Sequence, residues 1–230
     1  MCRLLYDKRM QTAPEKPAQP RRPKHDPKES EREILAATEQ LLRERPFREI
    51  NVDEIMRRTG LKRPAFYVHF RDKHDVVLRV VQEIGRELSS MAADYWFKGD
   101  DPYGDARRAL EAEVSIYHRH GPVLRAIADA ASADERVESA YRGLVQQFIT
   151  ETAQHIRDEQ SRGRISPLIN VDETARALTW LDERYLSETL GRTPQADPEV
   201  VVQVLYNIWV STLYGRGLST QQPTLVKAAR

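Results

Sequence analysis

Apolar side chains recur at helical spacing along most of this chain, and that spacing is the strongest constraint on its fold. In the first such segment the positions i, i+1, i+4, i+7 and i+8 of one helical face are Ile34, Leu35, Thr38, Leu41 and Leu42. Similar spacing returns in each later segment, and no segment alternates apolar and polar residues as a strand does. The sequence therefore predicts an all-α fold.

Prolines, glycines and capping residues divide these segments into about nine expected helices. Gly121-Pro122 is expected to end one helix and begin another, because proline removes a backbone donor and clashes with the preceding turn. The expected helices cover residues 30–45, 52–59, 62–70, 73–98, 105–119, 122–131, 134–161, 172–191 and 197–215.

Residues 52–70 are expected to form two short helices around a tight turn. Asn51 is followed three residues later by Glu54, which is the spacing of a capping box at a helix N-terminus. Gly60 can adopt the left-handed conformation that closes a helix, and Pro64 is tolerated in the first turn of the next one. This pattern indicates a helix-turn-helix, whose second helix enters the major groove of DNA.

The net charge is only +1, but its distribution is uneven. Residues 1–28 carry eight Lys or Arg against three Asp or Glu, whereas residues 81–230 carry 17 against 22. Such asymmetry is typical of a chain whose basic end binds nucleic acid. Five prolines between residues 11 and 30 predict a flexible basic arm over 1–29. We expect the arm either to contact DNA phosphates or a minor groove, or to be a solvated tail.

Other classes of protein fit the sequence poorly. Cys2 is the single cysteine, so one chain cannot build a disulfide framework. Residues 1–10 are too charged for a signal peptide, and the apolar stretch over residues 200–214 is shorter than the roughly 20 residues that span a bilayer. We therefore expect a cytoplasmic protein with no membrane partner.

Catalytic patterns are also missing from the sequence. His118 and His120 flank one residue, and His69 and His74 are five apart, but no carboxylate joins either pair at metal-ligand spacing. No nucleophile signature or phosphate-binding glycine loop occurs. The sequence thus predicts neither an enzyme nor a metal site nor a cofactor.

The head of the chain resembles the DNA-binding domain of the TetR family of transcriptional repressors. The resemblance runs from Ile34 over about fifty residues and rests on the patterns L-x-x-T-x-x-L-L, V-x-E-I, T-G-L, F-Y-x-H-F and D-K-x-x-V. It implies a dimer that binds a palindromic DNA operator and is released by a small, largely apolar effector.

The resemblance also implies roles for individual residues of the helix-turn-helix. Tyr67 and Lys73 match positions that bind phosphate, and Asn51 matches a phosphate contact at the start of the second helix. The residues expected on or near the groove-facing surface are Lys62, Arg63, Ala65, Val68 and His69.

Arg63 is the residue that we expect to read a base, because a guanidinium can bind guanine O6 and N7 together. Lys62 and Ala65 stand where the family often has Ser or Thr, so the operator sequence is expected to differ. Phe66 and Phe70 are expected in the core, whereas His69 is expected either to contact the groove or to pack.

The C-terminal half resembles the ethionamide-resistance-repressor branch of the same family. The motifs are A-L-T-W-L-D-E-R at residues 177–184 and N-I-W-V-S-T-L-Y-G at 207–215. They imply a homodimer through the last two helices, to which Tyr185, Tyr206 and Tyr214 are candidate contributors, and an elongated aromatic pocket. The candidate pocket residues are Tyr117, Tyr141, Phe148, Thr179, Trp180, Asp182 and Trp209, although an aromatic stripe is also typical of an ordinary core.

Asp182 replaces an amide at its matching position, which favours a less acidic or more cationic ligand. Together these patterns predict a basic arm over 1–29, a three-helix DNA-binding domain over 30–75, an effector-binding and dimerisation domain over 76–216 and a tail over 217–230. We expect ligand to move the long helix that begins at Asp72 and thereby to change the spacing of the two DNA-binding heads. The alternative is a helical interaction module whose helix-turn-helix docks on a protein.

Overall fold

The computed structural model describes residues 26–95 and 101–215, without the side chains of 91–95. Within these ranges the chain forms α-helices, one short 3-10 helix and no strand, which confirms the predicted all-α fold. The elements are α1 (Pro27–Glu44), η1 (Phe47–Glu49), α2 (Val52–Arg58), α3 (Arg63–His69), α4 (Lys73–Tyr95), α5 (Pro102–Ala131), α6 (Glu135–Ser161), α7 (Val171–Thr189) and α8 (Pro198–Tyr214). The predicted basic arm, up to residue 25, and the predicted tail lie outside the described residues.

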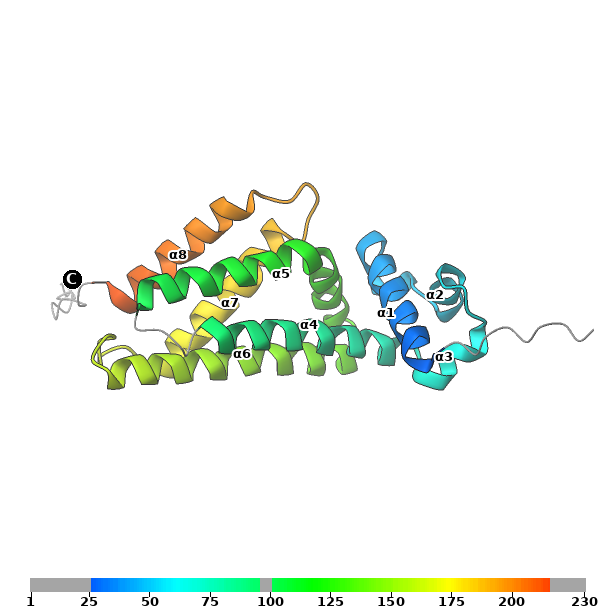
Figure 1. Cartoon of the computed structure of the whole chain (residues 1–230), viewed down its shortest axis with the longest axis horizontal. Coiled ribbons are helices and arrows are strands. Elements are labelled where there is room, and N and C mark those ends of the chain that lie inside the picture. Colours follow the sequence, from blue (N-terminus) through cyan, green and yellow to red (C-terminus); the bar gives the residue numbers. More distant parts are fainter. Residues whose placement is uncertain (1–25, 96–100, 216–230) are drawn as a thin grey trace, which may run out of the picture.

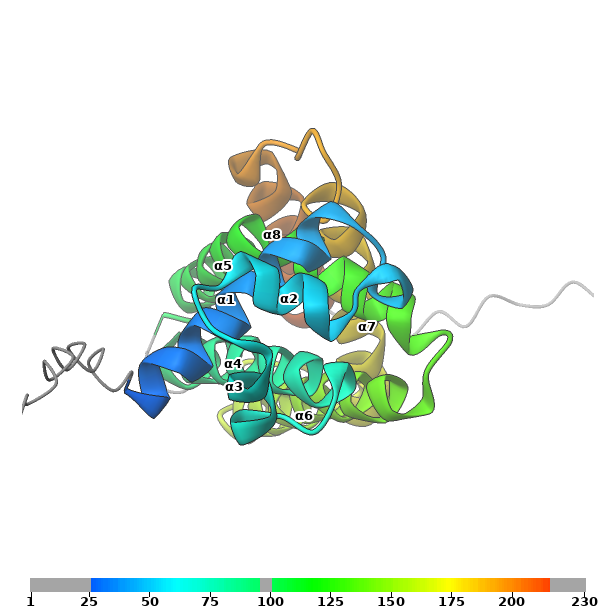
Figure 2. The same cartoon turned by 90° about the vertical axis from the view of Figure 1, so that its right-hand side faces the viewer.

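The first three α-helices gather at one end of the molecule as a head, and α4 to α8 form the body (Figure 1). Figure 2, which views the molecule from the head, shows α1, α2 and α3 in front of the body helices. Ile34, Ile55 and Phe66 are each 0% exposed, one from each helix of the head. The head is therefore built around side chains that the helical spacing placed inside.

Helix α1 begins at Pro27, three residues before its expected start. Asp26 caps it by accepting a hydrogen bond from the Lys28 N–H at 3.0 Å, and Pro27 lies where a missing N–H costs nothing. The last residues assigned to the arm, 27–29, are thus helical.

The break expected at Gly121-Pro122 is absent, and that prediction was wrong. Helix α5 continues through Pro122 to Ala131. The proline removes the N–H that would have bonded to the His118 carbonyl one turn earlier, and the Gln195 side chain donates to that oxygen at 3.1 Å instead. Two of the nine expected helices are therefore one, and the described residues contain eight α-helices.

The turn between α2 and α3 is closed differently from the prediction. Gly60 does not adopt the left-handed conformation; among the described glycines, Gly163 does, with φ of 72°. The Thr59 hydroxyl instead donates to the Met56 carbonyl at 2.9 Å and accepts from the Leu61 N–H at 3.2 Å. A side chain, and not an unusual backbone angle, shapes this turn.

Helix α5 is the centre of the body. It packs against α4, α6, α7 and α8, and it also contacts α1 of the head. Helix α4 leaves the head and runs beside α6 (Figure 1), so it both connects the head to the body and packs within the body. No helix within the described ranges is long and apolar enough to cross a membrane.

Two side-chain contacts join the head to the body at the start of α4. Arg136, in the first turn of α6, donates to the Asp72 carboxylate at 3.0 Å, and His74 Nε2 lies 2.7 Å from Asp134 Oδ2. Asp72 also accepts from the His74 and Asp75 N–H groups at 2.9 Å each, which makes it the N-cap of α4 as predicted.

Candidate nucleic-acid interface and ligand cavity

Helix α3 turns one face inward and the other to solvent. Phe66 is 0% exposed and Phe70 is 5% exposed, so both belong to the core as predicted. Tyr67 and Val68 are 50% and 74% exposed on the opposite side. An exposed valine on a short helix is available for apolar contact, such as that with a thymine methyl group.

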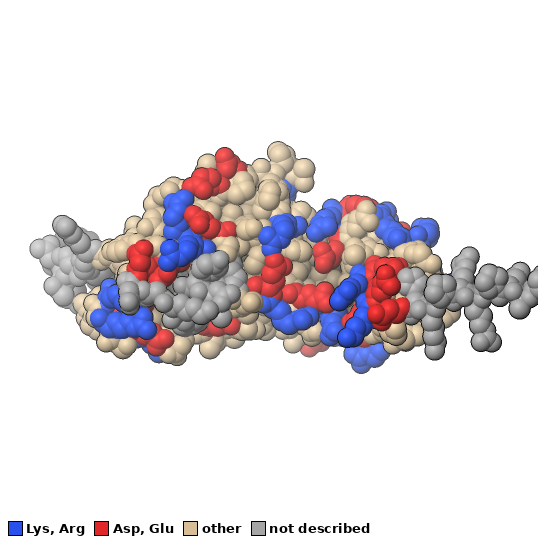
Figure 3. All heavy atoms as spheres, in the orientation of Figure 1, with Lys and Arg blue, Asp and Glu red and all other residues tan. Residues whose placement is uncertain are grey.

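The other residues predicted to face the DNA groove lie on or next to the exposed side of α3. Lys62 and Arg63 are exposed at the start of α3, whereas Ala65 and His69 are half-buried. Figure 3 shows Lys and Arg side chains at the outer edges of the head, with acidic side chains between them.

Arg63 already has partners in the free protein. Its guanidinium donates to the Asp53 carboxylate of α2 at 2.5 Å and to the Tyr67 hydroxyl at 3.1 Å. The hydrogen bonds to Tyr67 and Asp53 raise the pKa of Arg63 above its usual value. Because all three side chains are exposed, these contacts hold the guanidinium beside α3 yet can exchange with solvent or another anion.

Asn51 is occupied in capping helix α2. Its side chain accepts from the Glu54 N–H at 3.0 Å, and the Glu54 carboxylate accepts from the Asn51 N–H at 3.3 Å, which confirms the predicted capping box. Arg45 in turn donates to Glu54 at 2.8 Å. Both the side chain and the backbone N–H of Asn51, the predicted phosphate contact, are thus used within the protein.

Lys73 is bound by the backbone of η1. Its ammonium donates to the carbonyl oxygens of Phe47, Arg48 and Ile50 at 3.2, 3.4 and 3.0 Å. It also lies 4.5 Å from the centre of the Phe47 ring. The three donors of the ammonium are therefore engaged, and Lys73 ties the link between α1 and α2 to the start of α4.

A surface groove brings several of these side chains together. It is lined by Asn51, Arg63 and Lys73 and also by Arg48 and Arg136. The sequence analysis missed the last two: Arg48 lies in a connector that carried no motif, and Arg136 belongs to α6. No sequence signal singled out either residue; the fold brings both to this groove, which Glu49, Asp53 and Asp72 also line.

The body contains a cavity among α4, α5, α6, α7 and α8. It brings together six of the seven predicted ligand-binding residues, namely Tyr117, Tyr141, Phe148, Thr179, Asp182 and Trp209. Trp180 does not line it and is 37% exposed on the outside of α7, because adjacent residues of a helix point about 100° apart. The lining residues that the sequence analysis missed are Leu88, Glu113, Leu124, Leu144, Val145, Glu151, Thr152 and Glu183.

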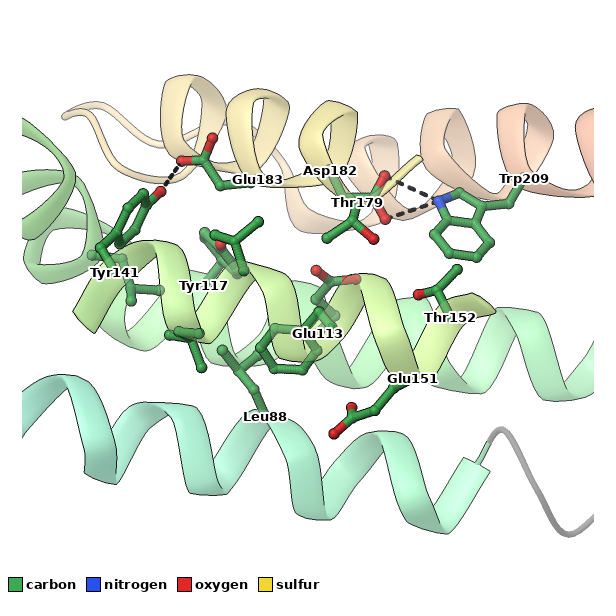
Figure 4. Close-up of a pocket in the computed structure, with 14 residues that line it drawn as sticks. Leu88, Glu113, Tyr117, Tyr141, Glu151, Thr152, Thr179, Asp182, Glu183 and Trp209 are labelled. Atoms are coloured by element: carbon green, nitrogen blue, oxygen red, sulfur yellow. Dashed lines mark hydrogen bonds between the residues drawn. The ribbon is translucent and has the colours of Figure 1, made fainter. Parts of the chain in front are cut away.

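Figure 4 shows the polar groups of this cavity. Trp209 Nε1 donates to the two oxygens of Asp182 at 3.0 and 2.8 Å, and the Tyr141 hydroxyl donates to Glu183. Thr179 Oγ1 and Glu151 Oε2 are buried and have no hydrogen-bond partner. Polar groups are thus available inside an otherwise apolar and aromatic wall.

Two carboxyl groups of the cavity titrate unusually. Burial raises the pKa of Glu113 to about 7. Burial, and then the neighbouring charge of Glu113, raise the pKa of Asp182 well above its usual value, while the Trp209 hydrogen bond opposes this. Glu113 is half-buried, and it lines the cavity.

The last two helices carry apolar side chains on the outside of the body. Trp180 and Leu181 of α7 are each 37% exposed, and Val200 and Val204 of α8 are 57% and 36% exposed. Exposed apolar side chains on two neighbouring helices are candidates for an interaction surface where they adjoin one another. The predicted contributors Tyr185 and Tyr206 are partly buried, and the Tyr214 hydroxyl lies 3.4 Å from Glu159.

Comparison with family models separates the chain into the same two parts. Residues 34–80 match the model of bacterial regulatory proteins of the TetR family. Residues 106–215 match the C-terminal domain of the transcriptional regulator EthR. The first match contains the helix-turn-helix, and the second contains most of the cavity.

Whole proteins with similar sequences are regulators. The HTH-type transcriptional regulator EthR of Mycolicibacterium smegmatis is 31% identical over 196 residues, which cover 84% of this chain and 89% of that protein. EthR of Mycobacterium tuberculosis is 31% identical over 187 residues, which cover 79% and 86%.

Solved structures agree at the level of the fold. A putative TetR-family regulator from Syntrophomonas wolfei has a TM-score of 0.72 at 13% identity, covering 86% of this chain and 100% of that one. A second from Rhodococcus sp. has a TM-score of 0.67 at 19% identity, covering 80% and 98%. With its helix-turn-helix and its similarity to EthR over most of its length, the chain belongs to the TetR family of DNA-binding transcriptional regulators as an EthR-like member.

Proposed function

We propose that this regulator is a repressor that binds a palindromic operator as a homodimer and is released by a small, largely apolar effector in the body cavity. The observation that carries the proposal is the course of α4. Lys73, at its first residue, bonds to the head, and Leu88, farther along, lines the cavity. One helix therefore connects the ligand site with the DNA-binding end.

On the DNA side, α3 enters the major groove. Arg63 leaves Asp53 to bind a guanine, Val68 contacts a neighbouring base, and the Tyr67 hydroxyl binds a phosphate. Asn51 and Lys73 act mainly by fixing the start of α2 and the link before it. Arg48, which is 82% exposed at its side chain and lies in the adjacent groove, supplies a further phosphate contact.

Dimerisation places two heads on successive faces of the operator, about 34–36 Å apart or a longer helical interval. The apolar surface of α7 and α8 supports an interface between identical copies, because a two-fold interface needs one self-complementary patch. Replacing Trp180 by Glu is expected to yield monomers in sedimentation analysis, whereas a monomeric wild type would contradict the dimer.

Release follows from differential affinity. A ligand that fits the cavity better when α4 has shifted stabilises the state in which the heads no longer match the half-site spacing. Leu88 of α4 and Phe148 of α6 face the same cavity, so a ligand between them acts directly on the position of α4.

The experiment is selection of bound fragments from genomic DNA by the full chain, followed by a compound screen for release. A discrete palindromic site that a compound releases is the expected result. Failure to enrich any fragment would favour the alternative, in which the head docks on a protein. Arg142→Ala on the outside of α6, which removes an exposed arginine paired with Glu138, is the matched control for variants of head cations.

A further inference from the structure

We propose that the cavity selects an organic cation, a protonated or quaternary amine on a small aromatic or branched apolar group, with its charge held between Glu113 and Asp182. This inference rests on the proposed function and names the chemical class of its effector. Glu113 comes from α5 and Asp182 from α7, and Figure 4 shows both turned with Thr179 toward the same central space.

The ionisable lining residues of the cavity that can carry charge near neutral pH are all acidic. Its four carboxylates come from three helices: Glu113, Glu151, Asp182 and Glu183. No Lys, Arg or His occurs among the described side chains that line it. An anionic ligand would meet four carboxyl groups there and no counter-charge.

The partners of these carboxylates are neutral groups. Trp209 donates to Asp182, and Tyr141 donates to Glu183. Gln147 donates to one oxygen of Glu151 at 2.9 Å, and the other oxygen is buried without a partner. Among the described side chains, Glu113 has neither a hydrogen-bond nor an ion-pair partner.

A buried carboxylate without a counter-charge is unfavourable and is relieved by a proton or by a cation. The raised pKa values of Glu113 and Asp182 indicate that the empty cavity uses a proton. A bound ammonium would replace that proton and supply the missing counter-charge. Uncharged ligands would leave the carboxyl pair protonated.

The remaining walls suit the apolar part of such a ligand. Rings of Tyr117, Tyr141, Phe148 and Trp209 line the cavity, and aromatic faces attract organic cations. The cavity has a volume of about 80 Å³, which is less than the roughly 150 Å³ of a cavity that binds benzene. One ring bearing a compact cationic group is therefore the upper limit of ligand size, and its entry requires wall side chains to move apart.

A matched pair of probes tests the charge alone. Benzyltrimethylammonium and neopentylbenzene have the same shape, with nitrogen in the first where the second has carbon. Titration calorimetry of the full chain at pH 8 is expected to show binding of the cation that is at least about tenfold tighter than that of the isostere. Phenylacetate, the anionic probe, is expected not to bind measurably.

Glu113→Gln keeps the shape of the side chain and removes its charge. We expect the preference for the cation over neopentylbenzene to fall by about tenfold, with the affinity for neopentylbenzene unchanged or increased. Glu111→Gln is the control, because Glu111 is exposed on the same helix and pairs with Arg107. Equal helical content and cooperative melting establish that both variants fold.

The proton exchanged for the cation gives a second readout. The titratable groups that face the cavity are Glu113 and Tyr117 from α5, Tyr141 and Glu151 from α6, and Asp182 and Glu183 from α7, whereas Leu88 of α4 and Trp209 of α8 do not titrate. With the pKa of Glu113 at about 7, affinity for the cation is expected to rise about tenfold from pH 6 to pH 8. The Gln variant is expected to lose most of this slope.

The outcomes separate the two proposals. Equal binding of the two probes, or a charge preference that survives in Glu113→Gln, overturns the cation inference. If neopentylbenzene or phenylacetate binds at least as tightly as the cation and releases the selected operator, the effector-responsive function stands and the cation inference fails. If the cation binds with the expected preference but operator affinity is unchanged, the cavity's selectivity stands and the proposed coupling to DNA fails.

Discussion

The head and the cavity handle charge in opposite ways. In the head, cations such as Arg63 and Arg58 bind acidic partners at the surface, Asp53 and Glu44. In the cavity, Asp182 is buried and Glu113 is half-buried, and neither faces a cation among the described side chains. Surface pairs exchange partners at little cost, whereas buried groups change their protonation or take a ligand. The first arrangement suits binding to a polyanion, and the second suits recognition of one small molecule.

The largest expected effect tests the head side of this contrast. Arg63→Ala combined with Tyr67→Ala removes the proposed base and phosphate contacts, each worth about 1–3 kcal/mol, so operator affinity should fall at least about thirtyfold. Fluorescence anisotropy with the selected operator measures it. Unchanged affinity in a folded dimer would contradict the assignment of α3 as the recognition helix.

The next effect tests the cavity side through stability. The native pKa of Glu113, about 7, lies above its ordinary value of 4.5, so the native state holds the proton longer than the unfolded chain. Its favourable contribution is full below about pH 4.5 and is lost as the pH rises through 7.

Glu113→Gln should therefore be more stable than the wild type at pH 8 by roughly 1–3 kcal/mol, and the difference should shrink toward pH 5. Urea unfolding at both pH values measures it, with Glu111→Gln as the surface control. A difference that does not change with pH would show that Glu113 is ionised throughout.

A smaller effect sharpens the idea that surface pairs exchange freely. Asp53→Asn removes the negative charge that binds Arg63 in the free protein. The same charge lies beside α3, where it would oppose DNA. Operator affinity should rise a few-fold at low salt, corresponding to about 0.2–1 kcal/mol, and the gain should shrink at high salt. Glu138→Gln on α6 should leave affinity unchanged, and a loss of affinity in Asp53→Asn would mean that Asp53 positions Arg63 for binding.

The smallest effect concerns the turn of the helix-turn-helix. A Cβ atom at Gly60 would meet nothing within 4 Å, and its φ is not positive. Gly60→Ala should therefore raise the free energy of unfolding by a few tenths of a kcal/mol, up to about 1. Gly163→Ala is the contrasting variant, expected to cost about 1 kcal/mol because of its φ of 72°. Thermal melting compares the two.

Local signals in the sequence were sufficient for much of the fold. The capping box of Asn51 and Glu54 involves atoms three residues apart, and the core positions Phe66 and Phe70 follow from helical spacing. The path of the chain through Pro122 was not predictable in this way, because Gln195, 77 residues from His118, satisfies the freed carbonyl.

Prediction of the ligand cavity and the DNA-binding surface from the sequence met the same limit, because both depend on contacts between distant segments. Six of the seven candidate ligand residues line the cavity, but Glu113 was missed because a glutamate on an amphipathic helix ordinarily faces solvent. Only the position of α5 between the other body helices puts it inside. Lys73 was predicted by resemblance at a contact position, yet its bonds to three carbonyl oxygens depend on the path of η1, which carried no motif.

Asp72 makes two different contacts where the head meets the body. One carboxylate both fixes the first residue of α4 and holds Arg136 of α6, and the Arg136 hydrogen bond lowers the pKa of Asp72 to about 2. This pivot therefore keeps its charge throughout the physiological pH range, even while the carboxyls of the cavity gain and lose protons. A change in pH can therefore alter the protonation of the cavity without breaking the Asp72–Arg136 contact at the start of α4.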